Sequence, residues 1–225
     1  MEPTEEPTRQ PTRTPADEPT ETPTEEPTRQ PTRTPTAVVL FTDDFSDPDS
    51  GWNAAEDDSA LRAYRAGQYV MEIFKTGWLI WDSPGQGGMS NTHTTVTITN
   101  AGESVDPTFG LICNYIDEGA FYFLGFGPDG YYGIGRVEAD STTLLTDPEK
   151  NLWQLSDDIE INAARYQVEA VCAADGALTL IVNGVEIASV QDDTYTEGDV
   201  GVFAQSFEQL PVEVHFDDLT VVQLD

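Results

Sequence analysis

Short apolar runs recur at regular spacing along most of this chain, and turns rich in glycine, aspartate and asparagine separate them. The densest stretch, residues 109–137, holds three such runs separated by two turn sequences: FGLICNYIDEGAFYFLGFGPDGYYGIGRV. Asn183-Gly184, between two further runs, is the strongest short hairpin signal in the chain, and Ala66-Gly67 also indicates a hairpin, between residues 60–64 and 68–74. We find no segment of useful length with the 3.6-residue period of a helix. The pattern therefore predicts an all-β fold built from two antiparallel sheets.

Residues 1–36 have a different composition from the rest of the chain. They consist almost entirely of Pro, Thr, Glu, Arg and Gln, and the sequence EEPTRQPTRTP at 5–15 recurs letter for letter at 25–35. Such a segment cannot bury enough apolar surface to offset the entropy lost on ordering. We expect a disordered Pro/Thr-rich repeat linker over residues 1–36 and one β-sandwich domain over residues 37–225.

The chain is strongly acidic, with a formal net charge of −31. Residues 1–36 hold eight of the 41 acidic and four of the ten basic residues, which leaves −27 on the remainder. A field of this sign repels nucleic acid and anionic membranes, so we exclude both as partners. The acidity indicates either divalent-cation binding or an adaptation to a saline habitat, and the scattered placement of the acids favours the second interpretation.

The sequence also bears on location. The first residues, MEPTEE, have neither the basic nor the apolar region of a signal peptide, and no window approaches the length of a membrane span. A Pro/Thr-rich stalk before a β domain is nevertheless typical of extracellular or cell-surface proteins. We expect this location, with a signal or anchor that is not part of this chain.

Several segments stand in an order that resembles a known family. DDFSDPDSGW and GQYVMEI come first, residues 109–137 follow, and VEAVCAADGALTLIVNGVEIASV, GDVGVFA and VEVHFDDLTV come last. Together they resemble the concanavalin A-like lectin/glucanase (laminin-G-like) jelly-roll domain of bacterial extracytoplasmic proteins. The resemblance implies an antiparallel two-sheet jelly roll. Because that superfamily contains lectins, adhesion domains and hydrolases, function has to be argued from the site.

A hydrolase motif of that superfamily is missing from the sequence. Laminarinase-type members carry E-x-D-x-x-E on one strand, which places a nucleophile and an acid on the same face. Here E-x-D begins at Glu56, Glu138 and Glu197, but no acid stands five residues further on. We therefore expect no catalysis through this motif, and a keto-sugar or glycoside hydrolase with another site is the third functional hypothesis.

The resemblance implies a concave face that binds sugars through aromatic platforms with polar neighbours. Strand alternation places Tyr115 on the same face as Phe109, Leu111 and Cys113, and places Phe121 and Phe123 opposite Tyr122. We assign the rings of Phe109, Phe121, Phe123 and Trp52 to the core. The candidate ligand-binding residues are Trp78, Trp81, Asn114, Tyr115, Tyr122, Tyr132 and Arg136.

Two further sites are expected. Both cysteines, Cys113 and Cys172, should point to a packed face, either as a disulfide or as two buried thiols. The resemblance favours the disulfide. It also implies a structural Ca²⁺ ion where the first and last strands pair, with Asp43, Asp44, Asp217 and Asp218 as candidate ligands.

The leading functional prediction is a non-catalytic extracellular carbohydrate-binding or adhesion module, with a glycan or cell-surface polysaccharide as its partner. The alternative is a ligand-sensing or scaffold ectodomain that binds protein or packs in a surface assembly. In that case the acids would serve salt tolerance and the aromatic residues would all belong to the core.

Overall fold

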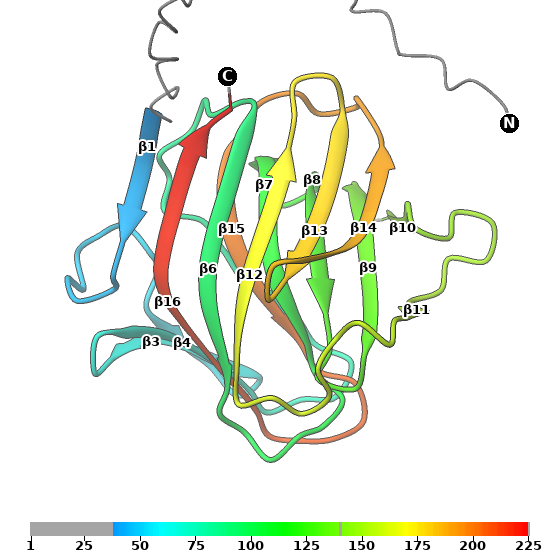
Figure 1. The fold of residues 1–225 in the computed structure, drawn as a ribbon. Coiled ribbons are helices and arrows are strands. Elements are labelled where there is room, and N and C mark those ends of the chain that lie inside the picture. The colour runs from blue at the N-terminus through cyan, green and yellow to red at the C-terminus, as the bar shows by residue number, and fades with distance from the viewer. Residues whose placement is uncertain (1–37, 140, 225) are drawn as a thin grey trace, which may run out of the picture. The chain divides into compact units, whose positions relative to one another are not determined.

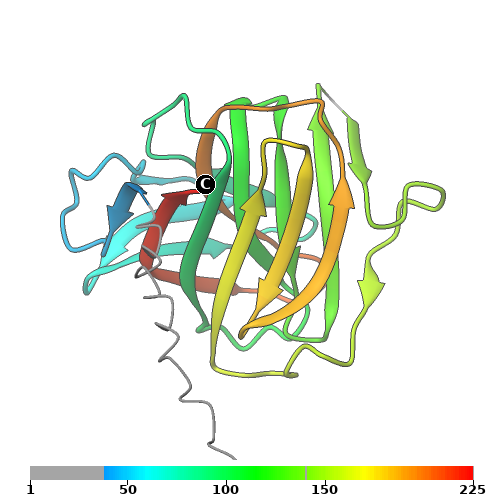
Figure 2. The same ribbon diagram turned by 45° about the horizontal axis from the view of Figure 1, so that its top comes forward.

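A computed structural model describes residues 38–139 and 141–224 of the chain. The linker predicted over residues 1–36 lies outside the described residues, so the predicted division of the chain stays a prediction. Over the described ranges every regular element is a β-strand, and no helix is long and apolar enough to cross a membrane. The strands form two antiparallel sheets that lie face to face (Figures 1 and 2).

The first sheet has nine strands in the order β14-β13-β12-β6-β16-β4-β3-β2, and β1 also pairs with β16. The long strand β16 pairs through its first half with β4 and through its second half with β1. Their bounds are β1 (Val38–Asp43), β2 (Ala55–Glu56), β3 (Ala60–Arg65), β4 (Gln68–Ile73), β6 (Thr92–Asn100), β12 (Arg165–Cys172), β13 (Ala177–Val182), β14 (Val185–Gln191) and β16 (Val212–Gln223).

The second sheet has seven strands in the order β10-β9-β8-β7-β15-β5, and β11 also pairs with β9. The segment 141–155, which we call the arm, contains β10 and β11 and projects from the edge of this sheet (Figures 1 and 2). The bounds are β5 (Leu79–Asp82), β7 (Thr108–Asp117), β8 (Ala120–Phe126), β9 (Tyr131–Glu138), β10 (Ser141–Leu144), β11 (Gln154–Leu155) and β15 (Asp199–Gln205).

Two hairpin turns have the backbone conformation that a two-residue loop between antiparallel strands needs. Asn183 and Gly184 both have positive φ values, 51° and 78°, and join β13 to β14 as a two-residue hairpin. Ala66 and Gly67, at 52° and 77°, join β3 to β4 in the same way. Positive φ at both central residues matches the right-handed twist of the flanking strands. Both predicted hairpins are confirmed, as are the three strands predicted within residues 109–137.

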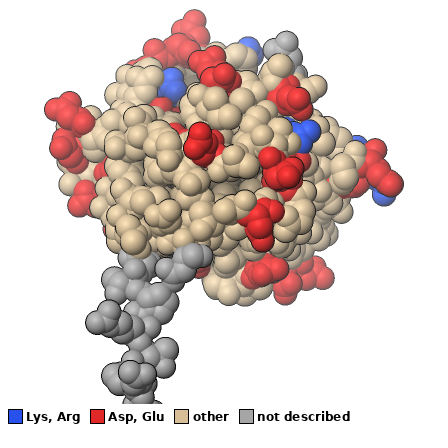
Figure 3. Space-filling model, turned by 90° about the horizontal axis from the view of Figure 1, so that it is seen from above, with Lys and Arg blue, Asp and Glu red and all other residues tan. Residues whose placement is uncertain are grey.

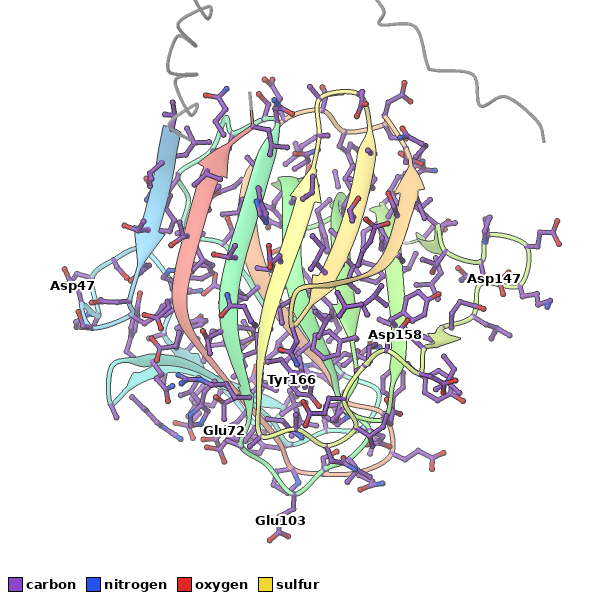
Figure 4. The ribbon with its side chains drawn as sticks, viewed as in Figure 1. Asp47, Glu72, Glu103, Asp147, Asp158 and Tyr166 are labelled. Carbon is purple, nitrogen blue, oxygen red and sulfur yellow. A yellow bond between two sulfur atoms is a disulfide. The ribbon has the colours of Figure 1, made fainter. Side chains whose placement is uncertain are left out.

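The main core lies between the two sheets, and alternate side chains of β8 and β12 point into it. On β8 the side chains of Tyr122, Leu124 and Phe126 point into it, and on β12 those of Tyr166 and Val168 do the same. The Tyr166 ring lies 5.0 Å from that of Phe126, between the layers (Figure 4). Burial of these apolar side chains is the largest favourable contribution to folding.

A disulfide crosses this core and joins the two sheets. Cys113 of β7 is bonded to Cys172 of β12, 59 residues further along the chain, and both residues are buried. The structure thus confirms the disulfide and excludes two buried free thiols. Because the bond closes a long loop, it restricts the unfolded chain and so stabilises the folded state.

Replacing Cys113 and Cys172 together by alanine should lower the free energy of unfolding by about 4 kcal/mol, the loop-closure entropy for a loop of this length. Urea unfolding of the wild type and the double variant measures the difference. A thiol reductant should destabilise the wild type and leave the double variant unchanged. A double variant as stable as the oxidised wild type would contradict this account.

Candidate functional site

Five aromatic side chains converge on the outer face of the seven-stranded sheet, the face turned away from the main core. They line an open cavity of about 220 Å³, which we call the aromatic groove. Three strands and the arm supply them, so one wall comes from β5, the floor from β8 and β15, and the other wall from the arm. The five residues are Trp81, Phe121, Phe123, Trp153 and Phe203.

The floor of the groove depends on glycines in the strands beneath the rings. A methyl group at Gly135 of β9 would lie 2.2 Å from Cζ of Phe123, and one at Gly125 of β8 would lie 2.3 Å from Cζ of Phe203. Neither glycine has a positive φ, so each is required for space rather than for backbone conformation. The rings of Phe123 and Phe203 therefore extend over glycines, and the two rings meet edge to face at 5.6 Å.

The polar residues of the groove carry no charge. Thr142, Asn151 and Gln205 line it together with the rings, and none of its lining residues is ionisable. Asn151 also holds the arm together, because its side chain accepts a hydrogen bond from the Leu144 amide (2.6 Å) and donates one to the Thr142 carbonyl (3.1 Å). Asp147, labelled in Figure 4, lies in the same arm.

A second, larger cavity of about 660 Å³ adjoins the groove, and we call it the polar cleft. Leu79 and Trp81 of β5 line both cavities, so β5 forms the ridge between them. The cleft contains carboxylates as well as Arg62, Trp78 and Tyr115. Acidic side chains are scattered over the molecular surface with few basic ones between them, as the face in Figure 3 shows.

The two buried carboxylates of the polar cleft are already engaged in the fold. Asp82 accepts hydrogen bonds from the Tyr69 hydroxyl and from the Asn53 (2.6 Å) and Ser83 (2.9 Å) amides. Asp199 accepts from the Ser83 hydroxyl (2.7 Å) and the Val200 amide (2.8 Å). Burial, followed by the nearby Asp82 charge, raises the pKa of Tyr69 far above its ordinary value.

Two of the predicted ligand-binding residues, Trp81 and Tyr115, line these cavities. Trp81 lines the groove, and the half-buried Tyr115 lines the polar cleft with its ring 5.6 Å from that of Phe121. The predicted alternation was wrong for Tyr115, because a bulge between Cys113 and Asp117 inserts Asn114 with a φ of 51°. The bulge turns Tyr115 to the face opposite Cys113. Ligand binding by Trp81 and Tyr115 stays a prediction.

Trp78 takes a different position from Trp81. Its half-buried ring packs against the main core and lines only the polar cleft. The Lys75 ammonium group lies over that ring, 3.9 Å from its centroid, and forms a cation–π contact. One face of Trp78 is therefore covered by the protein itself.

The structure buries Tyr122 and Asn114, and ligand binding by these two residues stays a prediction. Tyr122 is fully inaccessible in the main core, and its hydroxyl donates to the Asp192 carboxylate. Burial and this hydrogen bond raise the pKa of Tyr122 to about 12. Asn114 is 5% exposed, and its amide donates to the Tyr195 carbonyl (2.8 Å). Both side chains anchor the segment that follows β14.

Tyr132 and Arg136 are also not brought to the groove. Both project from β9 on the side of the main core, where Tyr132 is half-buried against it. Arg136 forms ion pairs with Asp192 (2.5 Å) and Glu138 (3.3 Å) and donates to the Thr194 hydroxyl. Its guanidinium group thus connects β9 to the segment after β14, and ligand binding by Tyr132 and Arg136 stays a prediction.

Sequence reasoning missed four of the five aromatic residues of the groove. Phe121 and Phe123 are buried as predicted, but in a separate cluster on the outer face rather than in the main core. Phe203 belongs to the same cluster, and Trp153 packs against it from the arm. The alternation of the strand sequence indicated that Phe121 and Phe123 lie on the face opposite Tyr122. No sequence pattern indicated the position of Trp153, because the arm contains little regular structure.

The predicted calcium ligands lie where β1 meets β16. Asp43, Asp44 and Asp218 line one open depression there with Asp47, which Figure 4 labels. Asp43 is 8% exposed and accepts hydrogen bonds from the Phe45 amide (2.7 Å) and the Trp52 indole (2.8 Å). Over the described ranges, no three Asp, Glu, His or Cys side chains are arranged to hold a metal ion.

Asp217 is turned toward another partner, Arg165, with 3.7 Å between the charged groups. Asp44 also accepts hydrogen bonds from the Ser46 hydroxyl (2.6 Å) and amide (3.0 Å), so three of the four predicted ligands are engaged within the protein. A calcium ion at this place would need backbone or water oxygens in addition to Asp44 and Asp218. The calcium site stays a prediction.

Comparison with solved structures gives the fold of the chain. A carbohydrate-binding module, CBM66 from Bacillus subtilis, is similar at 12% identity and a TM-score of 0.59, over 77% of this chain and 96% of that one. A β-glucanase from Bacillus licheniformis is similar at 9% identity and a TM-score of 0.56, over 84% of this chain and 100% of that one. The fold is the concanavalin A-like jelly roll.

A third similar structure is the κ-carrageenase from Pseudoalteromonas carrageenovora, solved with an oligosaccharide of κ-carrageenan. It matches at 9% identity and a TM-score of 0.56, over 89% of this chain and 99% of that one. No protein-family model matches the sequence, and no curated protein matches it. These likenesses confirm the predicted fold class, and the function has to be proposed from the groove.

Replacing Gly135 by alanine should cost about 1–3 kcal/mol of unfolding free energy, because the new methyl group overlaps the Phe123 ring. In a Phe123→Leu background the same replacement should cost much less, since the overlapping ring is gone. Urea unfolding of the four proteins of this double-mutant cycle measures the coupling. Equal costs in both backgrounds would show that the ring does not lie on the glycine.

If Asp44 and Asp218 hold calcium, the ion should raise the melting temperature of the chelator-treated protein. At a concentration 100 times Kd the expected stabilisation is about 2.7 kcal/mol. The Asp44→Asn/Asp218→Asn variant is the control and should not respond. A melting temperature that is the same in calcium and in EDTA contradicts this prediction.

Proposed function

We propose that this protein is a carbohydrate-binding module that holds a glycan chain in the aromatic groove. The observation that carries this proposal is an uncharged groove whose walls are the half-buried rings of Trp81 and Trp153, over a floor of the buried rings of Phe121, Phe123 and Phe203. The similar structures include a carbohydrate-binding module and glycan-cleaving enzymes, which agrees with such a role without deciding it.

The chemistry of the groove suits a sugar. Sugar rings have apolar C–H faces that stack on aromatic rings, and their hydroxyl groups need hydrogen-bond partners. Trp81 and Trp153 are the half-buried rings on opposite walls, and Thr142, Asn151 and Gln205 supply hydroxyl and amide groups beside them. A preformed groove of this kind binds with little loss of conformational entropy.

Binding without cleavage is the form of the proposal that the groove favours. Glycoside hydrolysis requires two carboxyl groups on either side of the bond to be broken. The residues that line the aromatic groove include neither Asp nor Glu. The groove therefore supplies adhesion rather than proton transfer.

We further propose an extracellular or cell-surface location. The disulfide between Cys113 and Cys172 supports it, because such bonds persist in oxidising compartments. A secreted binding module would also meet polysaccharides there.

Replacing Trp81 and Trp153 together by alanine should weaken binding of the recognised polysaccharide roughly tenfold or more, since aromatic anchors dominate such interfaces. Affinity electrophoresis in gels containing neutral polysaccharides measures the retardation. Tyr131→Ala is the matched control, because Tyr131 is 44% exposed on the same sheet but does not line the groove. Undiminished retardation of the Trp variant would exclude the groove as the binding site.

A further inference from the structure

The polar cleft contains an arginine that the protein leaves without an acidic partner. Of the four arginines in the described ranges, Arg65, Arg136 and Arg165 form ion pairs with carboxylates, whereas Arg62 forms none. This is unexpected in a domain with a net charge of −27, where acids are plentiful. A half-buried guanidinium group that lines a cavity without an acidic partner is available to a ligand.

The position of Arg62 relative to the groove is fixed by one contact. Its Nη1 donates to the carbonyl oxygen of Trp81 at 2.9 Å, and this is the hydrogen bond that holds its side chain. Trp81 is also the ring on the ridge between the two cavities. Arg62 therefore lies next to Trp81 in the polar cleft, and it does not line the aromatic groove.

A guanidinium group carries five N–H donors in a rigid fork, which suits two oxygen atoms side by side. Adjacent hydroxyl groups of a sugar ring offer such a pair. The exposed carboxylates of Glu56 and Glu118 line the same cleft and can accept hydrogen bonds from the same sugar. One donor fork facing two acceptors is complementary to a polyhydroxylated, uncharged ligand.

An acidic sugar fits this cleft poorly. Glu56, Asp57 and Glu118 line it around Arg62, and the domain as a whole is strongly negative. A uronate or sulfate group would gain one cation and face several anions in the same cavity. The charge distribution thus favours a neutral sugar.

We propose that Arg62 determines specificity for a neutral polysaccharide whose chain passes from the aromatic groove over Trp81 into the polar cleft. Arg62 donates to two neighbouring hydroxyl oxygens of the sugar unit in the cleft, and Glu118 accepts from that unit. This inference rests on the proposed glycan-binding function, and it adds both a second subsite and a ligand class.

The test compares the wild type with Arg62→Gln, Arg62→Lys and Glu118→Ala by affinity electrophoresis. The gels contain mixed-linkage β-glucan, xylan, galactan or levan as neutral polymers, and polygalacturonate as the anionic one. Arg65→Gln is the matched control, since Arg65 lies on the same strand but outside the cleft. Thermal melting of each variant checks that it is folded.

The wild type should be retarded by at least one neutral polymer and not by polygalacturonate. Arg62→Gln should weaken that binding roughly tenfold, the value of a charge-assisted hydrogen bond, and Arg62→Lys should weaken it as well because the fork is lost. Arg65→Gln should bind within about twofold of the wild type, as exposed ion pairs contribute little. If Arg62→Gln does not fold, the exposed-site variant Glu118→Ala decides instead. Weaker binding by Glu118→Ala supports the subsite, and binding as strong as that of the wild type overturns it.

The remaining outcomes separate this inference from the proposed function. Wild-type binding to a neutral polymer that survives Arg62→Gln overturns the subsite and leaves the groove as the binding site. Retardation by polygalacturonate that Arg62→Gln abolishes overturns the neutral ligand class. A wild type that no neutral polymer retards overturns both the inference and the proposed function.

Discussion

The outer face of the seven-stranded sheet depends on aromatic rings that lie over glycines of the neighbouring strands. Phe123 covers Gly135 and Phe203 reaches Gly125, at positions where any side chain would overlap the ring. Close packing of this kind tolerates little change in volume. Because the glycines leave room for these rings, Phe123 and Phe203 pack edge to face as an apolar floor, and the walls of Trp81 and Trp153 turn that floor into a groove.

The acidic groups of the domain are arranged so that this face stays uncharged. Arg136, Asp192 and Tyr122 form one hydrogen-bonded group at the edge between the sheets, and Asp82 accepts hydrogen bonds beneath the polar cleft. Buried charges are costly unless they are paired in this way. The fold therefore keeps ionised groups in closed networks or at the surface, and the groove retains only hydroxyl and amide groups beside its rings.

The sequence was sufficient for the fold but only partly for the site. Turn chemistry and alternation of period two predicted the hairpins at Ala66-Gly67 and Asn183-Gly184, because these signals are local. The same alternation failed beyond Asn114, since a bulge shifts the register by one residue and no local signal announces it. Trp153 was missed for another reason: its place is set by the packing of an irregular arm against a distant strand.

The central claim is that the rings of the groove contact a glycan, and the indole N–H resonances test it most directly. The four tryptophans give four such signals in a ¹H–¹⁵N spectrum of the labelled protein. During titration with oligosaccharides of the polymer that retards the protein, the Trp81 and Trp153 signals should shift. The Trp52 signal should stay in place, because its indole is buried and donates to Asp43. Saturable binding that leaves the Trp81 and Trp153 signals unmoved would contradict the account.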